Sequence, residues 1–133
     1  MNRSGSCLCG AVKFTAIDVS SEVHACHCSM CRRWSGGPGL AVSVAGLEFQ
    51  QDEQLRLFAS SDWAQRGFCQ QCGTNLFYLL TEPQQYMVWM GALDDQSGLT
   101  LSGEIFVDEK PPGYEFAGDH QRMTGEEFLA SLG

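Results

Sequence analysis

Short runs of apolar residues alternating with polar ones recur along the chain, and they predict strands rather than helices. Turn-forming clusters such as Gly36-Gly37-Pro38-Gly39 and Pro111-Pro112-Gly113 separate these runs. The predicted strands are Ala11–Ala16, Gly39–Val44, Leu55–Ala59, Asn75–Leu80, Tyr86–Gly91 and Glu104–Val107. No apolar run approaches the ~20 residues that a membrane-spanning helix needs. The pattern therefore predicts a mainly β fold.

Helical patterns are scarce. The segment Ser29–Trp34 is expected to form a turn that carries Cys31. Near the end of the chain, Thr124 followed by Glu127 three residues later is the pattern of a capping box, and it predicts a short helix that ends at Leu132. Because no internal repeat or linker appears, we expect residues 1–133 to form a single domain.

Acidic residues outnumber basic ones, and they concentrate in the second half of the chain. The 133 residues contain 8 Lys and Arg against 16 Asp and Glu, which gives a net charge of -8. Such a domain has no electrostatic reason to bind a phosphate backbone or an anionic membrane, so we expect no nucleic-acid or membrane partner. The first residues form no secretory signal, which favours a cytoplasmic location and reduced cysteines.

The seven cysteines are the most informative residues. They form three groups, a CxC pair (Cys7, Cys9), a CxCxxC triad (Cys26, Cys28, Cys31) and a CxxC pair (Cys69, Cys72). The odd number, the reducing location and the short spacing all disfavour disulfides, since a disulfide closing so small a ring is strained. Two sulfurs separated by one or two residues readily bind the same ion. The cysteines therefore predict metal ligands, and zinc is the expected metal.

Seven ligands divide most naturally into four and three. The two pairs would complete a closed structural zinc site of four cysteines that ties the amino-terminal strand to a loop about sixty residues later. The triad would form a site with a position left open, as catalytic zinc requires. An alternative grouping remains. In that grouping Cys28, Cys31, Cys69 and Cys72 form a ribbon-type site, and the other three cysteines are spare.

Three thiolates weaken zinc as a Lewis acid, so the triad is poorly suited to activating water. It is well suited to holding a further thiol as a thiolate that stays nucleophilic. The expected reaction is the addition of a small thiol to an electrophilic carbon, or its reverse. His27 is a candidate for proton transfer near pH 7; in the alternative, it is a residue that points away from the metal. Arg32 and Arg33 could receive carboxylates of the thiol substrate or form a solvated pair.

Three runs closely resemble the glutathione-dependent formaldehyde-activating enzyme family, whose domain is shared with centromere protein V. They are Cys7–Val12, Cys26–Arg33 and Arg66–Leu76, and the resemblance extends to Gly91–Asp95 and Ile105–Lys110. It implies small antiparallel sheets, a structural zinc at the two cysteine pairs and a catalytic zinc at the triad. The implied activity is the condensation of formaldehyde with glutathione to S-hydroxymethylglutathione, which is a carbon–sulfur lyase reaction in the reverse sense.

The sequence departs from this family pattern at two positions. A histidine often precedes the Ile-Phe-Val segment in the family, and a tryptophan often follows the Lys-Pro segment, whereas Glu104 and Gly113 stand here.

Two other function classes remain open: a non-catalytic zinc-binding interaction module, and a thiol enzyme like methionine sulfoxide reductase of the B type. Redox chemistry needs an unligated nucleophile with a resolving partner, and the cysteines here are all assigned to metal.

Overall fold

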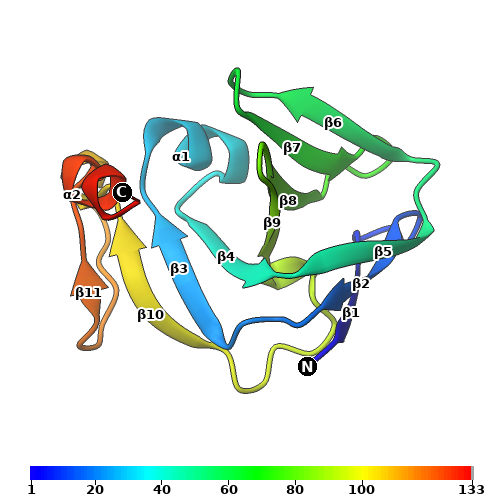
Figure 1. The fold of residues 1–133 in the computed structure, drawn as a ribbon, viewed down its shortest axis with the longest axis horizontal. Helices are drawn as coiled ribbons and strands as arrows, with labels where there is room; N and C mark the ends of the chain where they lie inside the picture. Colours follow the sequence, from blue (N-terminus) through cyan, green and yellow to red (C-terminus); the bar gives the residue numbers. More distant parts are fainter. Residues whose placement is uncertain (133) are drawn as a thin grey trace.

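A computed structural model describes residues 1–132 as two β-sheets and two short α-helices (Figure 1). Gly133, the last residue of the predicted domain, lies outside the described residues. The smaller sheet has three strands in the order β1-β2-β5, and both pairings are antiparallel. Its strands are β1 (Arg3–Ser6), β2 (Lys13–Ile17) and β5 (Gly46–Gln51).

The larger sheet has eight strands in the order β11-β10-β3-β4-β9-β8-β7-β6. Strand β10 pairs in parallel with both β3 and β11, and the other pairings are antiparallel. The strands are β3 (Glu22–Cys26), β4 (Gly39–Val44), β6 (Leu55–Ala59), β7 (Ala64–Cys69), β8 (Asn75–Thr81), β9 (Gln84–Trp89), β10 (Thr100–Ile105) and β11 (Gln121–Arg122).

The core lies where the two sheets meet. Phe14 of β2 and Phe77 of β8 are almost completely buried, and Phe49 of β5 lies between them, with ring centroids 6.2 Å and 6.1 Å away. Most other members of the core are small or β-branched, as suits a pleated surface. They include Val12, Ala16, Val23, Val42, Val44, Leu76, Leu79, Val88, Ala92 and Leu93.

Helix α1 (Ser29–Ser35) lies across the curved larger sheet, immediately after β3. Two hydrogen bonds anchor its last turn to the middle of that sheet. Asn75 of β8 donates to the Trp34 carbonyl oxygen at 2.6 Å, and the Trp89 indole of β9 donates to the Ser35 hydroxyl at 2.7 Å. The helix therefore holds residues that follow β3 against strands that come much later in the chain.

Helix α2 (Gly125–Ser131) begins with the predicted capping box. Thr124 accepts a hydrogen bond from the Glu127 backbone N–H, and the Glu127 carboxylate accepts one from the Thr124 N–H. Two single-turn 3₁₀ helices, η1 (Met90–Ala92) and η2 (Val107–Glu109), complete the elements. All helices within residues 1–132 are too short or too polar to cross a membrane.

The mainly β fold and the short C-terminal helix are confirmed, and β4 and β6 have the predicted bounds. Several expectations need correction. The segment expected as a turn at Ser29–Trp34 is a helix. The first predicted strand starts at Lys13 rather than Ala11, because the chain before it turns around the sulfur of Cys7, which accepts a hydrogen bond from the Val12 N–H.

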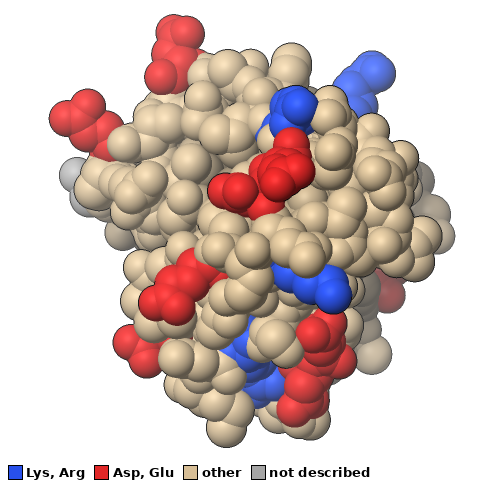
Figure 2. Space-filling model, turned by 90° about the vertical axis from the view of Figure 1, so that its right-hand side faces the viewer, with Lys and Arg blue, Asp and Glu red and all other residues tan. Residues whose placement is uncertain are grey.

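Strands β1, β3, β5, β7 and β11 were not predicted, and neither was the parallel pairing of β10. Strand β7 was missed because it contains the buried Arg66, and arginine normally marks an exposed position. On the face shown in Figure 2, the Lys and Arg side chains lie apart from one another, most of them beside acidic groups, so they form no continuous basic patch there.

Candidate metal centres

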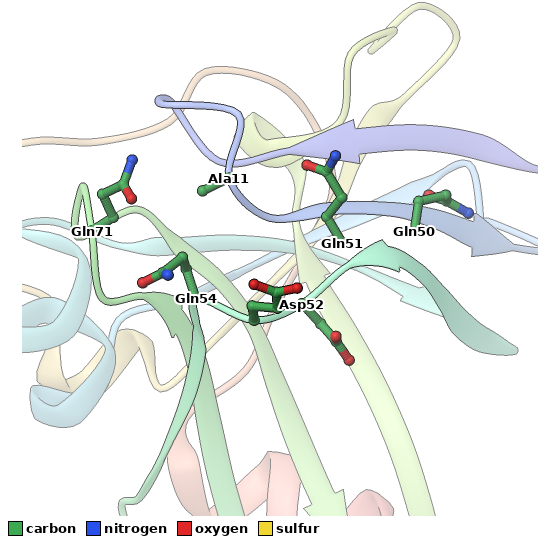
Figure 3. A pocket seen from close by; sticks show the side chains of 7 residues that line it. Ala11, Gln50, Gln51, Asp52, Gln54 and Gln71 are labelled. Carbon is green, nitrogen blue, oxygen red and sulfur yellow. The ribbon is translucent and has the colours of Figure 1, made fainter.

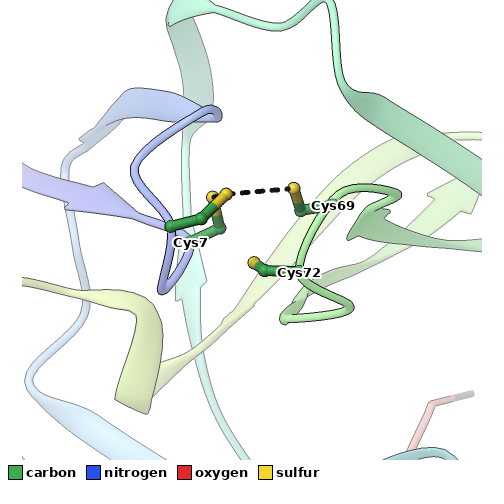
Figure 4. Close-up of side chains that lie close together, drawn as sticks. Cys7, Cys69 and Cys72 are labelled. Carbon is green, nitrogen blue, oxygen red and sulfur yellow. Dashed lines mark hydrogen bonds between the residues drawn. The ribbon is translucent and has the colours of Figure 1, made fainter.

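The two cysteine pairs meet in space, although about sixty residues separate them in the sequence. The sulfurs of Cys7, Cys9, Cys69 and Cys72 all lie within 4.8 Å of one another (Figure 4). Cys7 and Cys9 follow β1, Cys69 ends β7, and Cys72 lies in the turn before β8. Four sulfurs at this separation match the donor set of a closed, tetrahedral zinc site.

Both pairs lie on tight turns that are closed by backbone hydrogen bonds. Gly10 and Gly73 follow the second cysteine of each pair and have φ values of 80° and 82°, which a residue with a Cβ rarely adopts. Each glycine N–H donates to the carbonyl oxygen of the first cysteine of its pair, at 3.1 Å and 2.8 Å. A hydrogen bond with the Thr74 hydroxyl lowers the pKa of Cys72 to about 5. The second turn therefore favours a thiolate at Cys72 before any metal is considered.

The triad forms a second cluster at the junction of β3 and α1. Cys26 is the last residue of β3, Cys28 is the N-cap of α1, and Cys31 lies in the first turn of the helix. Their three sulfurs lie within 4.8 Å of one another, and the Cys31 backbone N–H donates to the Cys28 sulfur at 3.4 Å. The structure thus groups the sulfurs as four and three, and the ribbon-type alternative is not the grouping that it brings together.

The three sulfurs of the triad share negative charge unequally. Hydrogen bonds from the Cys26 and Cys31 thiols and from backbone N–H groups lower the pKa of Cys28 to about 2. Hydrogen bonding to Cys28 and Cys31, together with burial, raises the pKa of Cys26 far above its usual range. Three crowded sulfurs cannot all ionise unless a cation balances them. The triad therefore fits a divalent ion that accepts sulfur ligands, such as zinc.

A buried arginine contacts the triad from the opposite strand. Both terminal nitrogens of Arg66, on β7, lie 3.7 Å from the sulfur of Cys31. The side chain is only 2% exposed, and its guanidinium carbon lies 5.9 Å from the ring centroid of Trp34 and 5.1 Å from that of Tyr78. Hydrogen bonding with Cys26 and the positive charge of Arg66 act to lower the pKa of Cys31. Without a metal, hydrogen bonding with Cys28, burial and the negative charge of Cys28 outweigh them and raise that pKa above its usual value.

His27 lies between two cysteines of the triad and is completely buried. Its Nδ1 atom is 2.8 Å from the Tyr114 hydroxyl, and its Nε2 atom is 2.7 Å from Oε1 of Glu104. Both ring nitrogens are thus occupied by protein partners. This arrangement favours the alternative in which the His27 ring is directed away from the metal.

Glu104, one of the two departures from the family pattern, is the centre of a buried polar network. Besides His27, it forms ion pairs through Oε2 with His120 and with Nε of Arg122, the latter at 3.0 Å. Burial acts to raise the pKa of Glu104, but the hydrogen bonds from His120 and His27 outweigh it and hold that pKa below its usual value. Gly113, the other departure, is exposed in a turn just before Tyr114.

Arg32 and Arg33 follow the triad in α1 and differ in their surroundings. The Nε atom of Arg32 donates to the carbonyl oxygen of His27 at 2.9 Å, so part of this side chain supports the triad loop. Arg33 is exposed. Of the two, Arg33 has the guanidinium group more accessible to an anionic ligand.

A polar groove of about 410 Å³ lies beside the four-cysteine cluster (Figure 3). Gln71, one of its lining residues, donates from Nε2 to the Cys9 sulfur at 3.4 Å. The other lining residues are Ala11, Gln50, Gln51, Asp52, Glu53 and Gln54. No triad cysteine lines it, so the groove is not the mouth of the candidate active site.

The family model described as glutathione-dependent formaldehyde-activating enzyme matches residues 2–109, which include all seven cysteines. The chain belongs to this family. The matched segment also includes Arg66, His27 and Glu104, whereas Tyr114, His120 and Arg122 lie beyond it.

Similar proteins come from fungi and bacteria. An uncharacterised lyase of Schizosaccharomyces pombe is 31% identical over 130 residues, which cover 96% of this chain and 95% of the relative. A Halomonas elongata protein, provisionally named a glutathione-dependent formaldehyde-activating enzyme, is 30% identical over 87 residues, covering 58% of this chain and 55% of that protein. A crystal structure of a Rhodobacter sphaeroides protein superposes with a TM-score of 0.59 at 26% identity, covering 68% of this chain and 87% of the other.

Several residues around the triad of this family member were not assigned a role from the sequence. These residues are Arg66, Tyr114, His120 and Arg122. For Arg66 the sequence did contain a signal, because this arginine stands three residues before a CxxC pair. For the others, which follow the last predicted strand, no local pattern pointed to the triad.

Proposed function

We propose that this chain is a carbon–sulfur lyase of the S-(hydroxymethyl)glutathione synthase type, which adds glutathione to formaldehyde or a similar aldehyde and catalyses the reverse reaction. The observation that carries the proposal is the gathering of the sulfurs of Cys26, Cys28 and Cys31 at one end of β3. Three protein ligands leave one position of a tetrahedral zinc for a substrate sulfur. Family membership and the lyase name of the S. pombe relative support the same reaction class.

The proposed cofactors are two zinc ions, with glutathione as co-substrate. Cys7, Cys9, Cys69 and Cys72 would hold a structural ion, and the triad would hold a catalytic one. An ion at the triad would supply a positive charge that keeps a small thiol in its thiolate form at neutral pH. All seven cysteines fall into these two clusters, which speaks against a redox enzyme that needs a separate nucleophilic cysteine.

The proposed reaction needs no oxidant. The thiol loses its proton, its sulfur forms a bond to the aldehyde carbon, and the carbonyl oxygen gains a proton to become a hydroxyl group. In the reverse direction the carbon–sulfur bond breaks and the hydroxyl returns its proton. We propose that His27, fixed by Glu104 and Tyr114, positions the two flanking cysteines, and that Arg33 receives a carboxylate of glutathione.

Titration calorimetry with glutathione and S-methylglutathione tests the thiol-binding step. S-methylglutathione retains the carboxylates and the amine but cannot form a thiolate. We expect glutathione to bind the two-zinc protein at least about tenfold more tightly, and to release a proton that is detected by comparing two buffers with different ionisation enthalpies. Equal affinity for the two ligands would contradict the proposal. Binding of neither would favour a non-catalytic interaction module.

Exchange spectroscopy by NMR tests the chemical step. The protein is added to an equilibrium mixture of formaldehyde, glutathione and S-hydroxymethylglutathione, and the rate of exchange is measured. We expect the wild-type chain to accelerate exchange and the Cys28→Ser variant to lose the acceleration while it keeps the structural ion. Acceleration that is equal in both proteins would place the activity outside the triad.

We further propose that residues 1–133 act as one domain in this reaction.

A further inference from the structure

Arg66 carries a positive charge in the interior of the protein, and no carboxylate of residues 1–132 forms an ion pair with it. Arginine stays protonated in proteins, and a buried charge is costly unless an opposite charge compensates it. The side-chain ion pairs that the structure shows within residues 1–132 all involve Glu104, and none of them includes Arg66. The partner that both terminal nitrogens of Arg66 do approach is the Cys31 sulfur, at 3.7 Å.

The surroundings of Arg66 exclude water and strengthen this attraction. The guanidinium makes cation–π contacts with the rings of Trp34 and Tyr78. Trp34 is itself covered by a stacked ring, Phe58, at 6.2 Å, and by the edge of Phe68 at 5.7 Å. Charge interactions in such a setting are screened far less than those on the surface. Exposed Arg33 has no comparable enclosure.

The charge of Arg66 balances that of the triad with a divalent ion bound. Three thiolates around a divalent ion carry one net negative charge, which Arg66 neutralises. A fourth, anionic ligand then brings the whole to one negative charge instead of two. We propose that Arg66 is the fixed counter-charge of the Cys26–Cys28–Cys31 site, and that its charge favours an anionic fourth ligand, a thiolate, over a neutral one. The identity of that ligand as glutathione rests on the proposed function, whereas the counter-charge role does not.

The first test measures zinc affinity by competition with a chromophoric chelator. We compare the wild-type chain with Arg66→Gln, Arg66→Lys and a matched control, Arg56→Gln, which removes an exposed arginine from the neighbouring strand β6. We expect Arg66→Gln to weaken zinc binding at the triad, which is the weaker of the two sites, by at least about tenfold, because it removes a charge within ~4 Å of a ligand sulfur. The zinc affinity of the four-cysteine site should stay unchanged. Arg66→Lys should stay within about threefold of wild type, since it keeps the charge.

Two results would overturn the counter-charge role. One is that Arg66→Gln weakens zinc binding at the triad no more than the control Arg56→Gln does. The other is a loss in Arg66→Lys as large as that in Arg66→Gln, which would show that the shape of the guanidinium matters and its charge does not.

A double-mutant cycle with Cys31→Ser keeps the proposal testable if Arg66→Gln folds poorly. Cys31→Ser removes the sulfur that Arg66 contacts and leaves the buried charge without its direct partner. We therefore expect Arg66→Gln to raise the melting temperature when it is introduced into the Cys31→Ser variant, although it lowers that temperature in the wild-type chain. A fall in both backgrounds would overturn the proposal, because it would assign Arg66 a packing role that is independent of Cys31.

The second test measures ligand preference by titration calorimetry with both zinc sites loaded. Arg66→Gln should lose affinity for glutathione at least about fivefold relative to wild type, and should bind S-methylglutathione as the wild-type chain does. Equal losses for both ligands, or no loss for either, would overturn the preference for an anionic ligand. If the wild-type chain binds no glutathione, the proposed function fails, and the zinc titration then judges the counter-charge role by itself.

Discussion

The Oε1 atom of Glu104 lies 2.7 Å from Nε2 of His27, although the two residues are 77 positions apart in the sequence. Both side chains are buried. The contact follows from the parallel pairing of β10 with β3, which aligns Glu104 with Ala25 and Ile105 with Cys26. The carboxylate therefore buttresses the loop that carries Cys26 and Cys28. A residue that departs from the family pattern is thus part of the support of the candidate active site.

Replacing Glu104 by Gln should destabilise the protein. The amide keeps the size of the side chain but loses the charge that His120 and Arg122 contact, so we expect a loss of about 2 kcal/mol in the free energy of unfolding, measured with urea. Glu48→Gln, an exposed substitution on β5, is the matched control and should change stability by less than about 0.5 kcal/mol. Equal stabilities of the two variants would show that the network contributes nothing.

The stability of the protein should fall in acid in a way that depends on Glu104. The native pKa of Glu104 is lowered, so its contribution to stability is complete above the unfolded value of about 4.3 and is lost as the pH falls through the native pKa. Urea unfolding of wild type and Glu104→Gln between pH 3 and pH 7 measures this directly. The difference between them should be constant near neutral pH and shrink in acid. A difference independent of pH would mean that Glu104 does not titrate with folding.

Cysteine substitutions should separate the two candidate metal centres. Cys72→Ser should lower the melting temperature by at least about 10 °C, because the four-cysteine cluster joins the segment after β1 to the end of β7. Cys28→Ser should leave the melting temperature close to that of wild type and remove the more weakly bound ion. Metal analysis and calorimetry of both variants provide the check. If the Cys28→Ser variant unfolds as readily as Cys72→Ser, the sulfurs are grouped differently.

Arg32 and Arg33 should contribute differently. Arg32→Ala removes the hydrogen bond to the His27 carbonyl oxygen and should reduce stability by about 1 kcal/mol. Arg33→Ala should leave stability within about 0.5 kcal/mol of wild type while it weakens glutathione binding severalfold. Urea unfolding and calorimetry on both variants, with the exposed Lys13→Ala as the control, measure these effects. A destabilised Arg33→Ala variant would show that this side chain is structural.

Local patterns in the sequence were sufficient for features that a few neighbouring residues determine. The capping box of α2 depends on Thr124 and Glu127 alone, and it formed as predicted. The turns at Gly10 and Gly73 have the positive φ values that a chain turning beneath a cysteine pair requires. Close spacing likewise brought Cys26, Cys28 and Cys31 together, because one turn at the end of a strand contains all three.

Local patterns were insufficient where a residue's character conflicts with its position. Arg66 is buried within a strand, and a rule that places charged residues outside cannot find such a strand. The same holds for Glu104, whose burial is compensated by partners at His27, His120 and Arg122 that are distant in the sequence. The favourable partner must be known before the burial of a charge can be expected.

The spacing of the seven cysteines was enough to predict three groups of neighbouring sulfurs, because residues one to three positions apart lie close together. The meeting of the two pairs in one cluster was decided by the tertiary structure, since about sixty residues separate them. Tertiary structure alone decided what surrounds those clusters. The curvature of the eight-stranded sheet brings β7 against α1 and so places Arg66 on Cys31, and the parallel pairing of β10 with β3 places Glu104 on His27. Contacts of this kind depend on how the whole sheet closes around its core, a property that no short segment of the chain contains.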